Sequence, residues 1–363
     1  MGAQSTLSSW FTLFRFGNSL TGLIGVLFGA LLALDGFPKD EFASITILHG
    51  LSVWAFMCSW NALNDILDVD IDKENKPSRP IPSGVISLSH AKIVTASLML
   101  VSFLSLILAG YISTTLENGF QNWMPSIFIW FLAIFLLVNY ESSSNFSLKL
   151  KDRGLPGNIA ISLSVGMVIL FGGAGVFDFT NPRVISLFLI GFSYNLAREI
   201  IKDIEDMEGD KGRNTLAMRI GVEKTRIVAW VILLFTMASI LAPFALEIFP
   251  KIHLILIIPG LMLIFLVKRK LAYSEDRNAQ LLIKRSLQLS LLGLISTAQF
   301  SYIDLTIGFD QYPQETAWAI TQGPDTILSD DDYGYTNYVS NTITERLLME
   351  ASVTASSTCT PQM

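Results

Sequence analysis

Long apolar stretches alternate with short polar segments along most of this chain. A membrane-crossing helix needs about 20 mostly apolar residues, because the hydrocarbon layer is about 30 Å thick and each residue rises about 1.5 Å. Nine stretches approach or exceed that length: Phe11–Leu34, Ile45–Leu67, Ala91–Tyr111, Pro125–Tyr140, Leu155–Phe177, Val184–Ile201, Ile227–Ile248, Ile252–Val267 and Leu282–Tyr302. The pattern predicts an all-α membrane protein whose nine transmembrane helices form a bundle, since few other structures satisfy so much backbone inside lipid.

Composition supports this prediction and excludes several classes of protein. Of 363 residues, 51% are hydrophobic and 15% are charged, against about 25% charged in an ordinary soluble domain. The net charge of −6 gives no basic surface, so nucleic acid is not an expected partner. The two cysteines form no C-x-x-C pair, so neither a disulfide framework nor a zinc site is expected.

The composition changes near residue 303. Ser, Thr, Gly and Asp dominate from there on, nine residues are acidic and one is basic, and no apolar period persists. The sequence therefore predicts two parts: an intramembrane domain over residues 1–302 and a polar acidic tail over residues 303–363, mostly disordered and with a short helix near Thr344–Ser352.

Lysine and arginine are distributed unevenly over the predicted loops. Twenty-one of the 25 basic residues lie at the N-terminal end or in loops on the same side, and three lie on the other. Cytoplasmic loops carry such an excess. We therefore expect a multi-pass protein of the cell membrane whose N-terminus is cytoplasmic and whose tail, after nine crossings, is outside.

The second apolar stretch ends in a group of acidic residues. On a helix, Asp65, Asp68 and Asp72 stand at i, i+3 and i+7, which places three carboxylates on one face. Asn61 and Asn64 lie near the same stripe, one turn deeper.

The sixth stretch repeats this arrangement. Asp203, Asp206 and Asp210 have the same spacing, and Arg198 and Lys202 precede them. Both groups fall on the predicted cytoplasmic side.

Carboxylates on one face repel one another, and at a membrane boundary they are costly unless a cation neutralises them. Mg²⁺ prefers oxygen ligands and commonly bridges one or two carboxylates to substrate phosphates. The twin groups therefore favour a site for metal and diphosphate, with two solvated acidic helix ends as the alternative. Acids at a helix C-terminus oppose the helix dipole, so helix stability alone does not favour them.

Several basic residues lie near these groups. Three prolines stiffen the loop that carries Arg79, whose guanidinium can grip phosphate with two hydrogen bonds. Lys151 or Arg153 could reach a diphosphate, and each could equally anchor the loop at the membrane surface. Arg15 and Asn18 share a helix face, where Arg15 either extends to the lipid headgroups or forms a polar pocket with Asn18.

These motifs resemble the UbiA superfamily of intramembrane prenyltransferases over roughly residues 11–302. The residues that carry the resemblance are Asn64-Asp65-x-x-Asp68-x-x-x-Asp72 with Arg79-Pro80, Asp203-x-x-Asp206-x-x-x-Asp210, and Leu150-Lys151…Gly157-Asn158. The resemblance implies nine helices around a central cavity, with Mg²⁺ and a prenyl diphosphate held between the two aspartate motifs.

The resemblance also implies roles for single residues. The six aspartates would hold Mg²⁺ and form the catalytic site, and Arg79 and Lys151 would stabilise the charge that grows on the leaving diphosphate. Apolar walls would keep water from a cationic prenyl group, and an acceptor hydroxyl would attack it. The substrate-binding residues implied are Arg15, Asn18, Asn61, Asn64, Arg79, Lys151, Asn158, Arg198 and Lys202.

The stretches from Arg79 and from Arg198 are most similar to the branch that transfers a geranylgeranyl group to geranylgeranylglyceryl phosphate in archaeal-type ether lipid synthesis. That branch implies a lipid-like phosphate acceptor within the membrane lipids. Three alternatives stay open at this point: an aromatic acceptor of a quinone, tocopherol or chlorophyll-type pathway, a membrane transporter, and a non-catalytic membrane scaffold.

Overall fold

The structure is a computed structural model that describes residues 6–141, 147–208 and 214–299, and five segments after them. Its first helices are α1 (Thr6–Leu13), α2 (Phe16–Leu34), α3 (Asp40–Leu67), α4 (Val69–Asn75), α5 (Leu88–Ser113) and α6 (Gly119–Glu141). The remaining helices are η1 (Leu150–Asp152), α7 (Leu155–Gly175), α8 (Pro182–Glu205), η2 (Asp206–Glu208), α9 (Leu216–Ile220), α10 (Val222–Ala245), η3 (Lys251–His253), α11 (Leu254–Ala272) and α12 (Asp276–Gln299).

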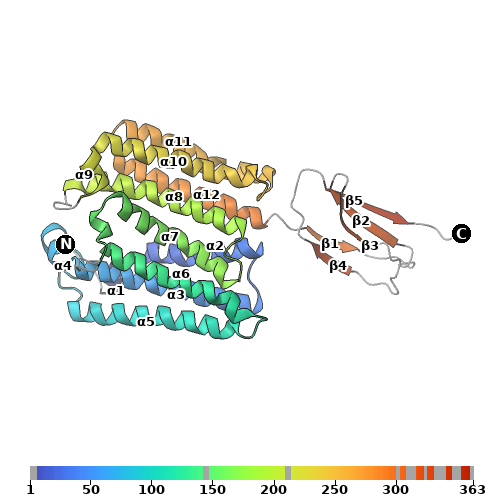
Figure 1. Ribbon diagram of the computed structural model, residues 1–363, viewed down its shortest axis with the longest axis horizontal. Helices are drawn as coiled ribbons and strands as arrows, with labels where there is room; N and C mark the ends of the chain where they lie inside the picture. The colour runs from blue at the N-terminus through green and yellow to red at the C-terminus, as the bar shows by residue number, and fades with distance from the viewer. Residues whose placement is uncertain are drawn as a thin grey trace.

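Nine of the described helices are long, and each corresponds to one of the nine predicted stretches. They form the elongated bundle of Figure 1. Helices that follow one another along the chain pack together, and α12 packs against α8 and α2 as well as α11. The contacts thus lead from α2 around the bundle and back to α2, so the predicted all-α bundle is confirmed.

The first predicted stretch differs from the structure because it contains two helices. Arg15 adopts a left-handed conformation (φ 45°, ψ 50°) between α1 and α2. Hydrogen bonds from the Asn61 amide to the Phe14 carbonyl (3.2 Å) and the Ser19 hydroxyl (3.3 Å) hold this break. A left-handed residue ends helical hydrogen bonding, so the chain turns at Arg15.

Helix α12 is the least apolar of the nine long helices. Eight of the described helices are long and apolar enough to cross a membrane by length and composition, and α12 is outside that group. Two of its serines have partners within the bundle. The Tyr194 hydroxyl lies 2.7 Å from the Ser286 hydroxyl and 3.0 Å from that of Ser290. Tertiary hydrogen bonds thus make a less apolar helix compatible with the core.

Close helix packing depends on small residues between α2 and α7. A Cβ atom at Gly29 would lie 2.1 Å from the Ile169 carbonyl oxygen, and one at Gly172 would lie 2.0 Å from that of Val26. Neither contact is possible for a larger residue. The two backbones therefore approach closely, as small residues allow in membrane bundles.

Five strands make up the described residues of the C-terminal part. They are β1 (Ile303–Ile307), β2 (Thr316–Gln322), β3 (Asp325–Asp330), β4 (Asn341–Glu345) and β5 (Val353–Cys359). β1 pairs antiparallel with β4, and β2 pairs antiparallel with β3 and β5, with a register shift between Ile320 and Thr321. The structure gives these five segments extended backbone, which their threonine, valine and isoleucine residues favour. The division near residue 302 and a mostly disordered tail stay predictions. The first two residues of the short helix predicted near Thr344–Ser352 lie in β4, and its next seven residues lie outside the described residues.

Candidate active site

Helices α3 and α4 present the first acidic group as a nearly continuous helix. The Asp68 amide donates to the Asn64 carbonyl (2.9 Å), and the Asp72 amide donates to the Asp68 carbonyl (2.8 Å). The i, i+3, i+7 spacing therefore survives the boundary between the two helices. Asp65 and Asp72 are buried and Asp68 is partly buried.

Two arginines contact this group from different segments. Arg15, at the break between α1 and α2, places Nη2 3.2 Å from Oδ1 of Asp65. Arg79 places Nη1 3.2 Å from the same oxygen and also forms an ion pair with Asp72. Two carboxylates buried at a membrane boundary are thereby neutralised, which their burial requires.

The packing of the proline-rich loop explains why Arg79 lies beside the aspartates. Ile81 and Ile86 of this loop are buried in one small cluster with Leu13 of α1 and Ala62 and Ile66 of α3. The loop backbone also turns on itself, with the Arg79 amide donating to the Lys76 carbonyl (3.0 Å). Burial of the isoleucines fixes the loop against α3, so Arg79 is held beside Asp65.

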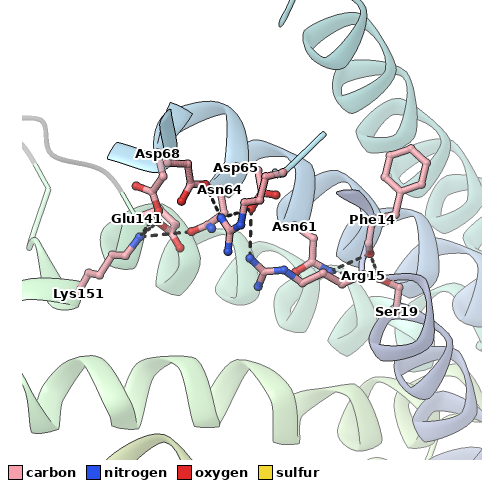
Figure 2. Close-up of polar contacts among 11 residues, drawn as sticks. Phe14, Arg15, Ser19, Asn61, Asn64, Asp65, Asp68, Glu141 and Lys151 are labelled. Carbon is pink, nitrogen blue, oxygen red and sulfur yellow. Dashed lines mark hydrogen bonds and ion pairs between the residues drawn. The ribbon is translucent and has the colours of Figure 1, made fainter. Parts of the chain in front are cut away.

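Lys151 lies against the remaining aspartate of the first group, as Figure 2 shows. Its Nζ atom donates to Oδ1 of Asn64 (3.3 Å), Oδ2 of Asp68 (3.1 Å) and Oε2 of Glu141 (2.8 Å). The first acidic group thus has a cationic partner for each of its three aspartates. Glu141 joins them from the end of α6, and no motif spacing in the sequence indicates it.

The second acidic group has a different environment. Asp203 is partly buried near the end of α8, and its Oδ2 accepts a hydrogen bond from the Asn158 amide (2.9 Å). Asp206 is exposed and caps the C-terminus of α8. Asp210 lies outside the described residues.

One short segment contacts both acidic groups. Lys151 in η1 reaches Asp68, and Asn158, seven residues later at the start of α7, reaches Asp203. In Figure 1, α4 and α9, which follow the two groups in sequence, lie at the same end of the bundle. The two aspartate groups therefore flank the segment between η1 and α7.

Gly154 is required in this segment. Its φ of 65° is in the left-handed region, and a Cβ atom there would lie 2.8 Å from the Leu216 amide nitrogen, at the start of α9. A glycine without Cβ permits both the turn and this approach. The loop that carries Lys151 is consequently held close to the chain that follows the second aspartate group.

Other predicted site residues lie farther from these contacts. Asn18 is exposed, and its carbonyl accepts from the Thr21 hydroxyl (2.6 Å). Among the described residues, the structure gives the Asn18 side chain no polar contact with the aspartates. Arg198 and Lys202 both pair with Glu199, at 3.2 Å and 3.3 Å, and are substantially exposed at the end of α8.

The match to a family model decides between the classes that the sequence left open. Residues 22–292 match the UbiA prenyltransferase family. The chain belongs to the UbiA prenyltransferase family. The prenyltransferase is thus a multi-pass membrane enzyme, and the transporter and scaffold alternatives are set aside.

Named relatives resemble the prenyltransferase over most of their length. A digeranylgeranylglyceryl phosphate synthase of Korarchaeum cryptofilum is 30% identical over 80% of this chain and 96% of its own. A protein of the same name from Methanobrevibacter smithii is 30% identical over 84% of this chain and 100% of its own. A third, from Methanosphaera stadtmanae, is 34% identical over 69% of this chain and 84% of its own.

Solved structures share the fold of the prenyltransferase. A structure described as giving insight into digeranylgeranylglyceryl phosphate synthase in membranes is 29% identical, with a TM-score of 0.61 over 81% of this chain and 99% of its own. A UbiA homologue from Archaeoglobus fulgidus, bound to GPP and Mg²⁺, is 16% identical, with a TM-score of 0.53 over 80% of this chain and 98% of its own. The UbiA-like architecture is therefore confirmed.

Proposed function

We propose that this prenyltransferase transfers a geranylgeranyl group from its diphosphate to the hydroxyl of geranylgeranylglyceryl phosphate, with Mg²⁺ as cofactor, in ether lipid synthesis. The main support for the site is that one segment, from Lys151 to Asn158, contacts both aspartate groups. The acceptor is supported by the names of relatives 30–34% identical to the chain.

The donor chemistry of the two groups fits Mg²⁺. Every acidic candidate ligand is an aspartate, whose hard oxygens Mg²⁺ prefers. Among the described residues, no three His, Cys, Asp or Glu side chains gather as a metal group. Mg²⁺ usually takes one or two carboxylates and completes its shell with waters and substrate phosphates, so a pair from either group satisfies it. The A. fulgidus homologue with GPP and Mg²⁺ supports this assignment.

Bound Mg²⁺ would take its one or two carboxylate ligands from Asp65, Asp68 and Asp72 on one side or from Asp203, Asp206 and Asp210 on the other. When bound, Mg²⁺ supplies Lewis-acid stabilisation of the charge on the diphosphate. Arg79 and Lys151 add positive charge beside the same oxygens and favour departure of the diphosphate. Asp65 and Asp68 already hold their guanidinium and ammonium groups at the proposed site.

The remaining predicted binding residues surround this centre. Arg15, Asn61 and Asn64 fix the first aspartate group and its neighbouring break, and Asn158 orients Asp203. Arg198 and Lys202 are exposed cations one to two turns before Asp206 and are suited to an anionic acceptor. Asn18 completes the polar face beside Arg15.

The test is product formation by the purified full chain in lipid. Labelled geranylgeranyl diphosphate and Mg²⁺ are supplied with geranylgeranylglyceryl phosphate in one reaction and a quinone-type aromatic acceptor in another. We expect a doubly prenylated glyceryl phosphate, formed only in the first reaction and stopped by EDTA. Prenylation of the aromatic acceptor alone, or turnover that survives EDTA, would contradict the proposal.

We also propose that the active site faces the cytoplasm and that the C-terminal tail lies outside. The excess of basic residues in the loops at the aspartate end supports this orientation. In a chain whose Cys58 and Cys359 are replaced by serine, single cysteines introduced at exposed Lys76 and Lys251 are expected to react with an impermeant thiol reagent from opposite sides of sealed vesicles. Labelling of both from one side would contradict the orientation.

A further inference from the structure

Glu141 is a partly buried carboxylate that the family motifs do not include. It is the last residue of α6, and its side chain is 9% exposed. A negative charge at a helix C-terminus opposes the helix dipole, so this position does not stabilise α6 by itself. Its partner is the Lys151 ammonium, 2.8 Å away. The position of Glu141 is therefore accounted for by its ion pair with Lys151.

The ammonium of Lys151 has all three of its N–H donors engaged. Its acceptors are Asn64, Asp68 and Glu141, and the contact with Glu141 is the shortest of the three. Lys151 is 16% exposed and Asp68 is 23% exposed. Such a partly buried ammonium needs compensating negative charge. Two carboxylates supply it from different elements, Asp68 between α3 and α4 and Glu141 at the end of α6 (Figure 2).

The loop before Lys151 is also attached to the end of α6. The Leu148 amide donates to Oδ1 of Asn139 (3.0 Å), and the Ser147 hydroxyl donates to the Asn139 carbonyl (3.3 Å). Asn139 precedes Glu141 by two residues. The last turn of α6 thus holds the loop backbone through Asn139 and the Lys151 side chain through Glu141.

The two carboxylates differ in their position relative to the proposed site. Asp68 belongs to the aspartate group that would bind metal, whereas Glu141, at the end of α6, is not part of that group. A divalent cation at Asp68 would weaken its attraction for Lys151, because the two cations repel each other. Glu141 alone would then keep the ammonium in place.

We propose that Glu141 is a positioning residue: it retains Lys151 beside the aspartates when a metal-bound diphosphate engages Asp68, so that the released N–H groups donate to the diphosphate. This inference rests on the proposed function, because it assigns the site a diphosphate. The group recognised is a diphosphate with a divalent cation, whatever hydrocarbon it carries.

Pyrophosphate binding tests this inference without requiring catalysis. The thermal midpoint of the full chain in detergent is followed as pyrophosphate is added at fixed Mg²⁺, for the wild type, E141Q, K151M and the double variant. We expect E141Q to weaken the apparent affinity for pyrophosphate about tenfold, as for loss of a charged hydrogen bond. In the K151M background the same change is expected to have less than about a twofold effect, because no ammonium remains to be positioned.

Asp152 supplies a matched control. It is an exposed carboxylate next to Lys151 in η1, so D152N removes an equal charge from the same turn. We expect D152N to change pyrophosphate affinity by less than about twofold. An equal loss in D152N and E141Q would show a general charge effect and overturn the proposal.

If E141Q lowers the affinity for pyrophosphate equally with and without Lys151, the proposal is also overturned. Unchanged affinity in E141Q would overturn it as well. If E141Q lowers the melting temperature without ligand, E141D carries the test: it keeps the carboxylate, so we expect most of the affinity to be retained, and a tenfold loss would contradict the inference. Prenyl transfer is assayed separately, so a failed acceptor assay with intact coupling contradicts the proposed function alone.

Discussion

The two aspartate groups share one sequence spacing but have different surroundings. In the first group, Arg15, Arg79 and Lys151 supply a cation to each of Asp65, Asp68 and Asp72. In the second, Asp203 accepts hydrogen bonds from two neutral donors, the side-chain amide of Asn158 and the backbone amide of Leu216, and Asp206 is exposed. Equal spacing along a helix therefore does not give equal electrostatics, because the partners come from other elements.

This difference suggests how the two groups divide the work of binding. The first group is closely neutralised, so a metal ion there competes with arginine and lysine for carboxylate oxygens. In the second group, Asp203 has neutral amide partners and Asp206 is exposed, so these two carboxylates are freer to take a divalent cation. The first group brings the cations that face a diphosphate, and the second brings the freer ligands for metal.

The largest expected effect is loss of a metal-binding carboxylate from either group. We expect D65N and D206N each to lower the turnover number about 1000-fold, as for removal of a central electrostatic contact. Their melting temperatures should differ, because D65N leaves Arg15 and Arg79 without their shared carboxylate whereas Asp206 is exposed. The turnover number and the melting temperature of each variant are measured in lipid-reconstituted protein. A near-normal turnover number in either variant would exclude the replaced aspartate from the site.

Loss of Arg79 should have the next largest effect. R79M leaves the buried Asp72 without its arginine and Asp65 with Arg15 only. We expect kcat/KM for the prenyl diphosphate to fall about 100-fold and the free energy of unfolding to fall by about 2 kcal/mol. Steady-state kinetics and denaturation measure the two. A stability loss with unchanged kinetics would make Arg79 a structural counter-ion.

Loss of Asn158 tests one neutral partner of the second group. N158A removes the amide donor from Asp203, and we expect kcat/KM to fall about tenfold, as for loss of one hydrogen bond to a charged group. The matched control is S162A, which removes the contact between Ser162 and the Asn195 amide (3.2 Å), also between α7 and α8. Equal rate losses in the two variants would show that the effect comes from helix packing.

The smallest effect is expected at Asp70, which lies inside the first motif but off its face. Its side chain is 87% exposed and pairs with Lys73. D70N should change activity by less than about twofold, because exposed ion pairs contribute little. D72N, two residues later, serves as the comparison. A large loss in D70N would mean that the helical face does not define the site.

The apolar pattern predicted the helical part of the fold well. Each of the nine stretches corresponds to a long helix, because burial in lipid makes length and hydropathy visible in the local sequence. The break at Arg15 was not predicted. It depends on a hydrogen bond from Asn61 to the Phe14 carbonyl, and these two residues are 47 apart in the sequence. The strands after residue 302 were not predicted, because an acidic, polar composition indicates disorder whereas the β-branched residues of these segments favour strands.

The candidate site was predicted in part. The spacing of Asp65, Asp68 and Asp72 identified a common face, and the proline-rich loop identified Arg79. Glu141 was missed, because nothing in its neighbours along the chain marks it as a partner of Lys151. The pairing of that lysine with Asp68 also joins residues 83 apart, a separation over which helical periodicity carries no information.

The sequence by itself determined that this protein crosses the membrane repeatedly and carries two helix faces of aspartates, because both properties follow from local hydropathy and the 3.6-residue turn. Only the tertiary structure decided which cation or amide meets each aspartate. Lys151 and Asn158 reach different acidic groups from one short segment because α3, α6, α7 and α8 come together there. Packing between distant segments cannot be read from the local sequence of any one of them.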